Sequence, residues 1–111
     1  MAGTLKRIGP LALTATPTTN VYNNASALLY DVIKHLEVVN RTAVAHNFTL
    51  FIGATGANAA GTEWFIAVNV PANSVYHWYG NKKILSTDFI VGGADLITTL
   101  TIMMESEQSV V

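Results

Sequence analysis

The chain contains no cysteine and few charged side chains, and these two shortages limit what it can be. Without cysteine it has neither a disulfide framework nor a thiolate metal site. Charged residues make up 12% of its 111 residues, whereas a typical soluble domain has about 25%. The net charge of -1 gives no general attraction to nucleic acid or to anionic lipid. We therefore expect neither nucleic acid nor a membrane among its partners.

Long apolar runs are also missing, although half of the residues are hydrophobic. No run approaches the roughly 20 residues that are needed to span a bilayer. The apolar run that follows Lys6 and Arg7 is short and is interrupted by Pro10, so we expect no signal peptide. A chain of 111 residues is expected to fold as one domain.

The shortage of charge has a consequence for the surface. Only six basic and seven acidic side chains are available to solvate the exterior of the domain. We therefore expect neighbouring subunits to cover part of that exterior. The alternative is a weakly charged β protein that is rich in threonine and asparagine. In such a protein these residues would hydrate the surface without any neighbouring subunit.

Alternating side chains predict a series of short strands, because successive strand residues point to opposite faces. The central stretch, residues 28–53, is predicted to form two long strands, 30–40 and 44–53, joined by a turn at Asn40. Paired β-branched residues and the lack of clear helix caps argue against a helix over residues 27–38.

Further strands follow the central pair. Residues 64–70 and 74–79 are predicted to form a second hairpin, and residues 96–104 the last strand. In the first central strand the alternation predicts two faces. One face has Tyr30, Val32, Lys34, Leu36 and Val38. The other face is half polar and has Asp31, Ile33, His35, Glu37 and Val39.

Seven or eight short antiparallel strands separated by turns predict an all-β protein. The expected architecture is a single β-sandwich of jelly-roll or immunoglobulin-like type. Residues 1–16 are expected to form an N-terminal arm or edge strand, because Pro10 and Pro17 confine that segment to a sheet edge or an irregular path. Residues 17–104 are expected to form the sandwich and residues 105–111 a C-terminal tail.

Aromatic and terminal apolar residues are the candidates for contact with partners. Tyr76 and Trp78 share one face of a predicted strand, where they would bind a partner protein or stack on a sugar. The alternative is that some of these rings lie in the core. The candidate interface residues are Leu5, Ile8, Tyr76, Trp78, Tyr79, Val110 and Val111.

Catalytic and metal-binding motifs are missing from the sequence. His35, His46 and His77 are its only histidines, and a hairpin could bring His35 near His46, but their spacing is not typical of a metal site. The chain has no Gly-x-Ser-x-Gly, no His-Glu-x-x-His and no P-loop. We therefore expect no enzyme activity, no metal and no cofactor.

Four segments together resemble a known group of proteins. They are IKHLEVVNRT (residues 33–42), FTLFIGATGANAAGTEWF (48–65), VPANSVYHWYG (70–80) and DFIVGGAD (88–95). They are similar to small β-sandwich accessory structural proteins of tailed bacteriophage virions. The resemblance covers residues 15–104 and rests on turns and core alternation, so it marks no site residue.

The resemblance implies a non-enzymatic structural protein that decorates or cements a capsid. A minor tail or fibre-associated protein of the virion is an alternative, and a carbohydrate-binding module that uses Trp78 and Tyr79 is another. The implied partners are further copies of the chain, as a trimer or another homo-oligomer, and a major capsid or tail protein. The implied location is the virion, assembled in the host cytoplasm.

Overall fold

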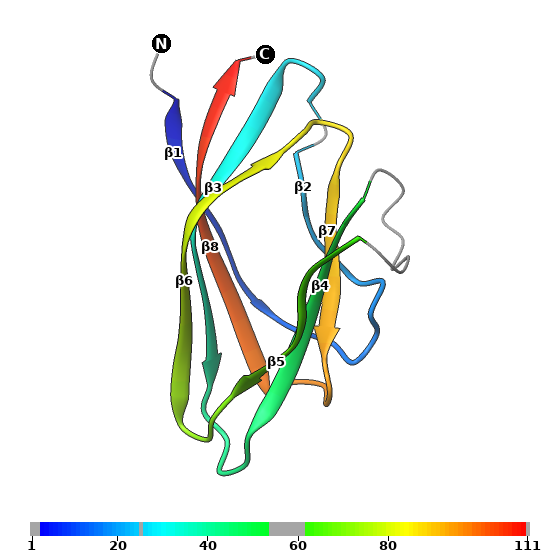
Figure 1. The fold of residues 1–111 in the computed structure, drawn as a ribbon, viewed down its shortest axis with the longest axis vertical. Coiled ribbons are helices and arrows are strands. Elements are labelled where there is room, and N and C mark those ends of the chain that lie inside the picture. Colours follow the sequence, from blue (N-terminus) through cyan, green and yellow to red (C-terminus); the bar gives the residue numbers. More distant parts are fainter. Residues whose placement is uncertain (1–2, 25, 54–61, 111) are drawn as a thin grey trace.

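The computed structural model describes residues 3–24, 26–53 and 62–110. These residues form an all-β sandwich of two four-stranded antiparallel sheets that face each other (Figure 1). Its strands are β1 (Thr4–Ala12), β2 (Asn20–Asn23), β3 (Leu29–Asn40), β4 (His46–Gly53), β5 (Glu63–Val70), β6 (Ser74–Ile84), β7 (Phe89–Ala94) and β8 (Leu100–Val110). The predicted fold class, a single β-sandwich of seven or eight strands, is confirmed.

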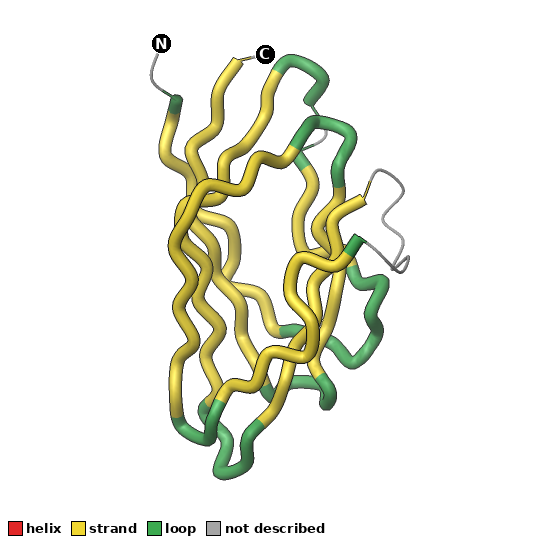
Figure 2. The backbone as a smooth tube through the Cα atoms, viewed as in Figure 1, coloured by secondary structure: helices red, strands yellow, loops and turns green. Residues whose placement is uncertain are grey.

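The strand order shows which kind of sandwich this is. The first sheet has the order β1-β8-β3-β6 and the second has the order β2-β7-β4-β5. Among these eight described strands, only β4 and β5 are neighbours both along the chain and within one sheet. Every other connection passes from one sheet to the other at an end of the sandwich (Figure 2). This is the strand order of an eight-stranded jelly roll, one of the two architectures that the sequence predicts.

Both hairpins predicted from the sequence are wrong as pairings, although their strands exist. β3 pairs with β6 and β8, whereas β4 pairs with β5 and β7. β5 and β6 are likewise in different sheets. A short turn in the sequence is compatible with either a hairpin or a connection between the two sheets. Here both turns are connections between the two sheets. Residues 54–62 are rich in alanine and glycine, which predicts a loop there, and residues 54–61 lie outside the described residues.

A β-bulge divides the two faces of β3. The register with both neighbouring strands shifts between Ile33 and His35, so Lys34 lies in the bulge and is exposed. Before the bulge the odd-numbered Asp31 and Ile33 point inward, and after it the even-numbered Leu36 does. The uninterrupted alternation predicted for this strand is therefore wrong before residue 34, because a bulge adds one residue to one strand of a pair.

A second irregularity occurs in β5. Ala67 has a φ of 42°, in the left-handed region, and the register with β4 shifts beside it. Phe65 is buried before this point and Val70 after it, while Ile66 is exposed. The simple alternation of residues 64–70 that the sequence suggests is therefore broken at Ala67.

The two ends of the chain belong to the first sheet. β1 is an edge strand, and it pairs with β8 along its length from Thr4 opposite Gln108 to Ala12 opposite Thr101. The last strand begins later and ends later than the predicted 96–104, because residues 105–110 continue β8 between β1 and β3. These residues are part of the sandwich rather than a tail beyond it.

The core fills the space between the sheets. Both sheets contribute aliphatic side chains and aromatic rings to it. The largest fully buried side chains are Phe48, Leu13, Ile33, Leu36, Leu50, Ile84, Ile90, Leu100, Ile102, Met104, Val38 and Val70. The ring of Phe48 in β4 lies edge-on to Tyr76 of β6, with ring centroids 5.7 Å apart, so an aromatic contact joins the two sheets.

Candidate functional site

Five polar or aromatic side chains gather on the outer face of the first sheet, the face turned away from the second sheet. His35 and Glu37 belong to β3, His77 and Tyr79 to β6, and Glu105 to β8. In the strand register His35 lies between Glu105 and Tyr79, and Glu37 lies opposite His77. Alternate residues of a strand share a face, so these positions form a compact group. We call it the outer-face cluster.

The two histidines of the outer-face cluster are in direct contact. His35 Nε2 lies 3.0 Å from His77 Nδ1, and His35 Nδ1 lies 3.1 Å from Glu105 Oε1. His77 Nδ1 is also 3.8 Å from Glu37 Oε2. One ligand atom from each of His35, Glu37 and His77 lies within 4.8 Å of the other two. The cluster therefore has two imidazoles and the Glu37 carboxylate close together. A second carboxylate, that of Glu105, contacts the other ring nitrogen of His35.

The surroundings of the cluster orient one histidine and leave the other open. The ring of Tyr79 stacks on that of His35, with centroids 4.5 Å apart and planes 13° from parallel. The side chain of His35 is 17% exposed, whereas that of His77 is 45% exposed. His35 is thus held between Tyr79 and Glu105, while His77 lies on an edge strand and is more open to solvent. Nitrogen and carboxylate donors arranged in this way suit a metal cation.

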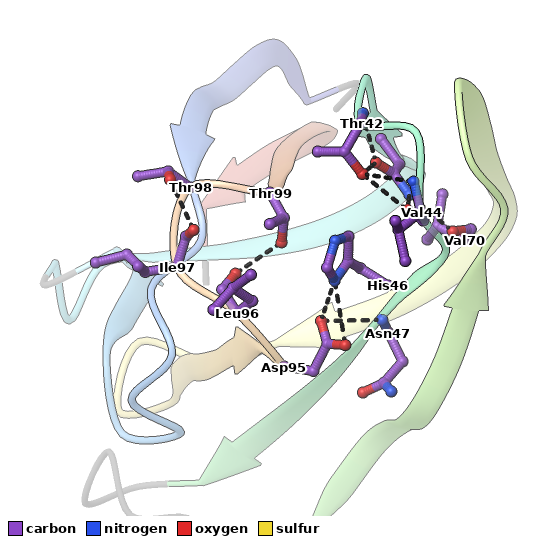
Figure 3. A network of polar contacts seen from close by, with 11 residues as sticks. Thr42, Val44, His46, Asn47, Val70, Asp95, Leu96, Ile97, Thr98 and Thr99 are labelled. Atoms are coloured by element: carbon purple, nitrogen blue, oxygen red, sulfur yellow. Dashed lines mark hydrogen bonds and ion pairs between the residues drawn. The ribbon is translucent and has the colours of Figure 1, made fainter.

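The sequence did not reveal the histidine pair. A hairpin between the central strands would have placed His35 near His46, but those strands are in different sheets and that expectation is wrong. His46 instead lies at the start of β4, where its Nδ1 is 3.0 Å from Asp95 Oδ1 (Figure 3). The backbone N–H of Asn47 donates to the same oxygen at 3.3 Å. The signal that could have found the cluster is the pair of motifs His35-x-Glu37 and His77-x-Tyr79, in which alternation places both members on one face.

A second polar group is buried inside the sandwich. Asp31 is fully buried, and its carboxylate accepts hydrogen bonds from the Tyr22 hydroxyl at 2.8 Å, the Ser106 hydroxyl at 3.1 Å and Gln108 Nε2 at 3.3 Å. Tyr22 belongs to β2, in the other sheet, so the group connects the two layers. Burial raises the pKa of Tyr22. The hydrogen bond to Asp31 and the negative charge of Asp31 raise that pKa further. The network is structural, because both oxygens of the buried carboxylate accept hydrogen bonds from side chains of the two sheets.

The raised pKa of Tyr22 makes stability depend on pH under alkaline conditions. The unfolded tyrosine ionises near pH ~10, before the folded one, so high pH favours unfolding. The stabilisation is fully present below that pH and is lost as the pH rises through the raised pKa of the folded state. We expect the free energy of unfolding, measured in urea between about pH 8 and pH 11, to decline less steeply in Tyr22→Phe than in the natural chain. Equal declines would contradict this assignment.

A third polar group fixes the connection between β3 and β4. Asn40 is fully buried, and its Nδ2 donates to the carbonyl oxygens of Val44 and Val70 at 2.9 and 3.0 Å. Its Oδ1 accepts from the backbone N–H and the hydroxyl of Thr42 at 2.9 and 2.8 Å. The amide is therefore fully bonded and holds the chain as it passes from one sheet to the other.

The predicted interface residues have different surroundings. Leu5 and Tyr79 are 80% and 71% exposed, and Val110 is exposed too. Ile8 is only 7% exposed and packs in the core, so its assignment to a free surface is wrong. Tyr76 and Trp78 share a face as predicted, but it is the inner face, where both are partly buried against the core. Val111 lies outside the described residues.

The inward direction of Trp78 follows from its strand. Alternation along β6 turns Tyr76 and Trp78 toward the core and leaves His77 and Tyr79 on the outer face. The Trp78 ring lies edge-on to Trp64, with centroids 5.3 Å apart. Trp78 and Tyr79 therefore point to opposite faces and cannot form one stacking platform.

Comparison with known proteins provides no relative for this chain. No family model, no curated protein and no solved structure matches it. None of the described residues belongs to a helix that is long and apolar enough to cross a membrane.

Proposed function

We propose that this protein is a non-enzymatic structural component of a bacteriophage virion that decorates or cements the capsid through contacts between subunits. The sequence resemblance to accessory virion proteins supports this function. The strand order supports it as well, since the jelly roll is an architecture that viral capsid proteins use, together with lectins and other classes. The proposed location is the virion, and the proposed partners are further copies of the chain and a major capsid or tail protein.

The observation that carries the proposal is the exposure of large apolar or aromatic side chains on three edge strands. β1 and β6 are the edges of the first sheet, and β5 is an edge of the second. Each has a large, strongly exposed apolar or aromatic side chain: Leu5, Tyr79 and Ile66. An edge strand presents unpaired backbone groups, and charged side chains are one of the means by which soluble proteins protect such edges. From residue 64 to residue 70, β5 has no charged residue at all.

The choice among the edges falls on β5. β1 contains Lys6 and Arg7, and β6 contains Lys82 and Lys83, so both have charges that oppose unspecific pairing. β5 lacks this protection next to Ile66, which is 68% exposed. We therefore place the main contact between copies of the chain at the free edge of β5. Trp78 is turned inward, so no observation favours a sugar-binding function.

Sedimentation velocity over a range of concentrations tests this proposal. The natural chain is expected to form an oligomer, and Ile66→Lys is expected to shift it to monomer, because a lysine at the contact opposes strand pairing. Val44→Lys is the matched control: Val44 is 64% exposed but lies in a connection outside the strands, so its replacement is expected to leave the oligomer intact. A natural chain that stays monomeric at high concentration would contradict the proposal.

A further inference from the structure

We infer that His35, Glu37 and His77 form a binding site for a divalent transition metal ion of the Zn²⁺ type. The site is independent of the structural function proposed above. Its donors are two imidazole nitrogens and one carboxylate oxygen, which are the ligands that Zn²⁺ takes from proteins when no thiolate is available. All three donor atoms lie within 4.8 Å of one another.

Two of the three distances between donor atoms are close to those of a filled site. Two imidazole nitrogens that bind one tetrahedral Zn²⁺ at about 2.0–2.1 Å are about 3.3–3.4 Å apart. His35 Nε2 and His77 Nδ1 are 3.0 Å apart, and His77 Nδ1 and Glu37 Oε2 are 3.8 Å apart. These two distances need to change by about 0.3–0.5 Å to reach that value, and the donor atoms of His35 and Glu37 lie within 4.8 Å of each other. The metal would replace the hydrogen bond that now joins the two rings.

Glu105 prepares His35 for this function. Its Oε1 lies 3.1 Å from His35 Nδ1, so in the neutral imidazole the Nδ1–H donates to the carboxylate and the lone pair of Nε2 points toward His77. A histidine that binds a metal usually donates its other ring N–H to a carboxylate or carbonyl, which fixes its tautomer and orientation. Glu105 is thus a positioning residue, and the arrangement carboxylate–histidine–metal follows from the strand register.

The scaffold favours binding as well. His35 and Glu37 lie on β3, which is hydrogen-bonded on both sides, and the stacked Tyr79 ring limits the movement of His35. His77 is the exposed member, so it can rotate to complete the site. The three ligands leave one position of a tetrahedral ion toward solvent, where a water molecule or a side chain of another molecule would bind.

Isothermal titration of the untagged chain with ZnCl₂ tests the site. We expect one ion per chain, with His77→Ala and Glu37→Gln each weakening binding by at least about tenfold. His46→Ala is the matched control, because His46 also contacts a carboxylate, Asp95, but belongs to another end of the sandwich. It is expected to bind Zn²⁺ as the natural chain does.

A second readout separates ligands from the positioning residue. Co²⁺ should show the visible absorption of a tetrahedral site in the natural chain and lose it in His77→Ala. Glu105→Gln is expected to lower the affinity about tenfold and to keep both the stoichiometry and the Co²⁺ spectrum. The inference is overturned if the natural chain binds Zn²⁺ no more tightly than His77→Ala does, or if His46→Ala loses as much affinity as His77→Ala.

Discussion

Replacing Asp31 by alanine is expected to lower the free energy of unfolding by about 4 kcal/mol. A hydrogen bond to a charged group contributes about 1.5–3 kcal/mol, and buried donors without an acceptor are costly. Asp31 accepts three such bonds and is fully buried, so its removal leaves Tyr22, Ser106 and Gln108 without their acceptor. Urea unfolding followed by circular dichroism measures the loss.

The matched control is the same substitution at Asp88. That carboxylate accepts one hydrogen bond, from the backbone N–H of Leu85 at 2.9 Å, in an exposed turn. We expect Asp88→Ala to cost about 1 kcal/mol, less than a buried bond to a charged group, because water can replace the lost partner at the surface. If Asp31→Ala costs no more than Asp88→Ala, the buried network does not hold the two sheets together.

Replacing Phe48 by alanine is the second large effect, with an expected loss of about 3–5 kcal/mol. Phe48 is fully buried in β4, and its ring contacts Phe65 of the same sheet and Tyr76 of the other, with centroids 5.6 and 5.7 Å away. Truncation removes these contacts and leaves a cavity between the sheets. Phe48→Leu keeps most of the volume and is expected to cost about 1–2 kcal/mol. Both values come from urea unfolding of the variants.

A double-mutant cycle refines this prediction. Phe48→Leu and Tyr76→Leu are expected to be coupled by about 0.5–1.5 kcal/mol, which is the contribution of an aromatic pair beyond the area that it buries. The result also concerns Tyr76 as an interface candidate. If the two substitutions are additive and Phe48→Ala costs less than about 1 kcal/mol, the inward packing of both rings is contradicted.

The existence of the strands could be predicted from the sequence, but their partners could not. Alternation identifies β3, β4 and much of β5 and β6, because a half-buried strand has a period of two. Pairing depends on which sheet the chain enters after each turn. Asn40 illustrates the difficulty: it reads as a hairpin turn, yet its buried amide bonds Val44 and Val70 and holds a connection between the sheets.

Irregularities in β3 and β5 explain why the sequence pattern assigns some of their side chains to the wrong face of the sheet. A bulge at Lys34 reverses the alternation of β3, and the positive φ of Ala67 does the same in β5. Neither position has glycine, the residue that most often indicates such a break. The assignment of Ile8 to the surface failed for another reason: of the two expectations for residues 1–16, an arm or an edge strand, the structure has the edge strand, which pairs with β8 and turns Ile8 inward.

The outer-face cluster depends on pairing and was therefore hidden from the sequence. His35 and His77 are 42 residues apart, and Glu105 is 70 residues from His35. Only the strand order β8-β3-β6 brings them together. The sequence did indicate that His35 and Glu37 share a face, which is correct because both lie after the bulge.

We propose that this chain is a structural part of a virion and that neighbouring subunits cover its exposed apolar edges. The most direct measurement is a cryo-electron microscopy reconstruction of the particles that assemble when the chain is produced from its native genome. The proposal predicts density for the sandwich on the particle at a fixed copy number, with the free edge of β5 and Ile66 against a neighbour. Particles that lack the chain, or hold it with that edge open to solvent, would contradict the account.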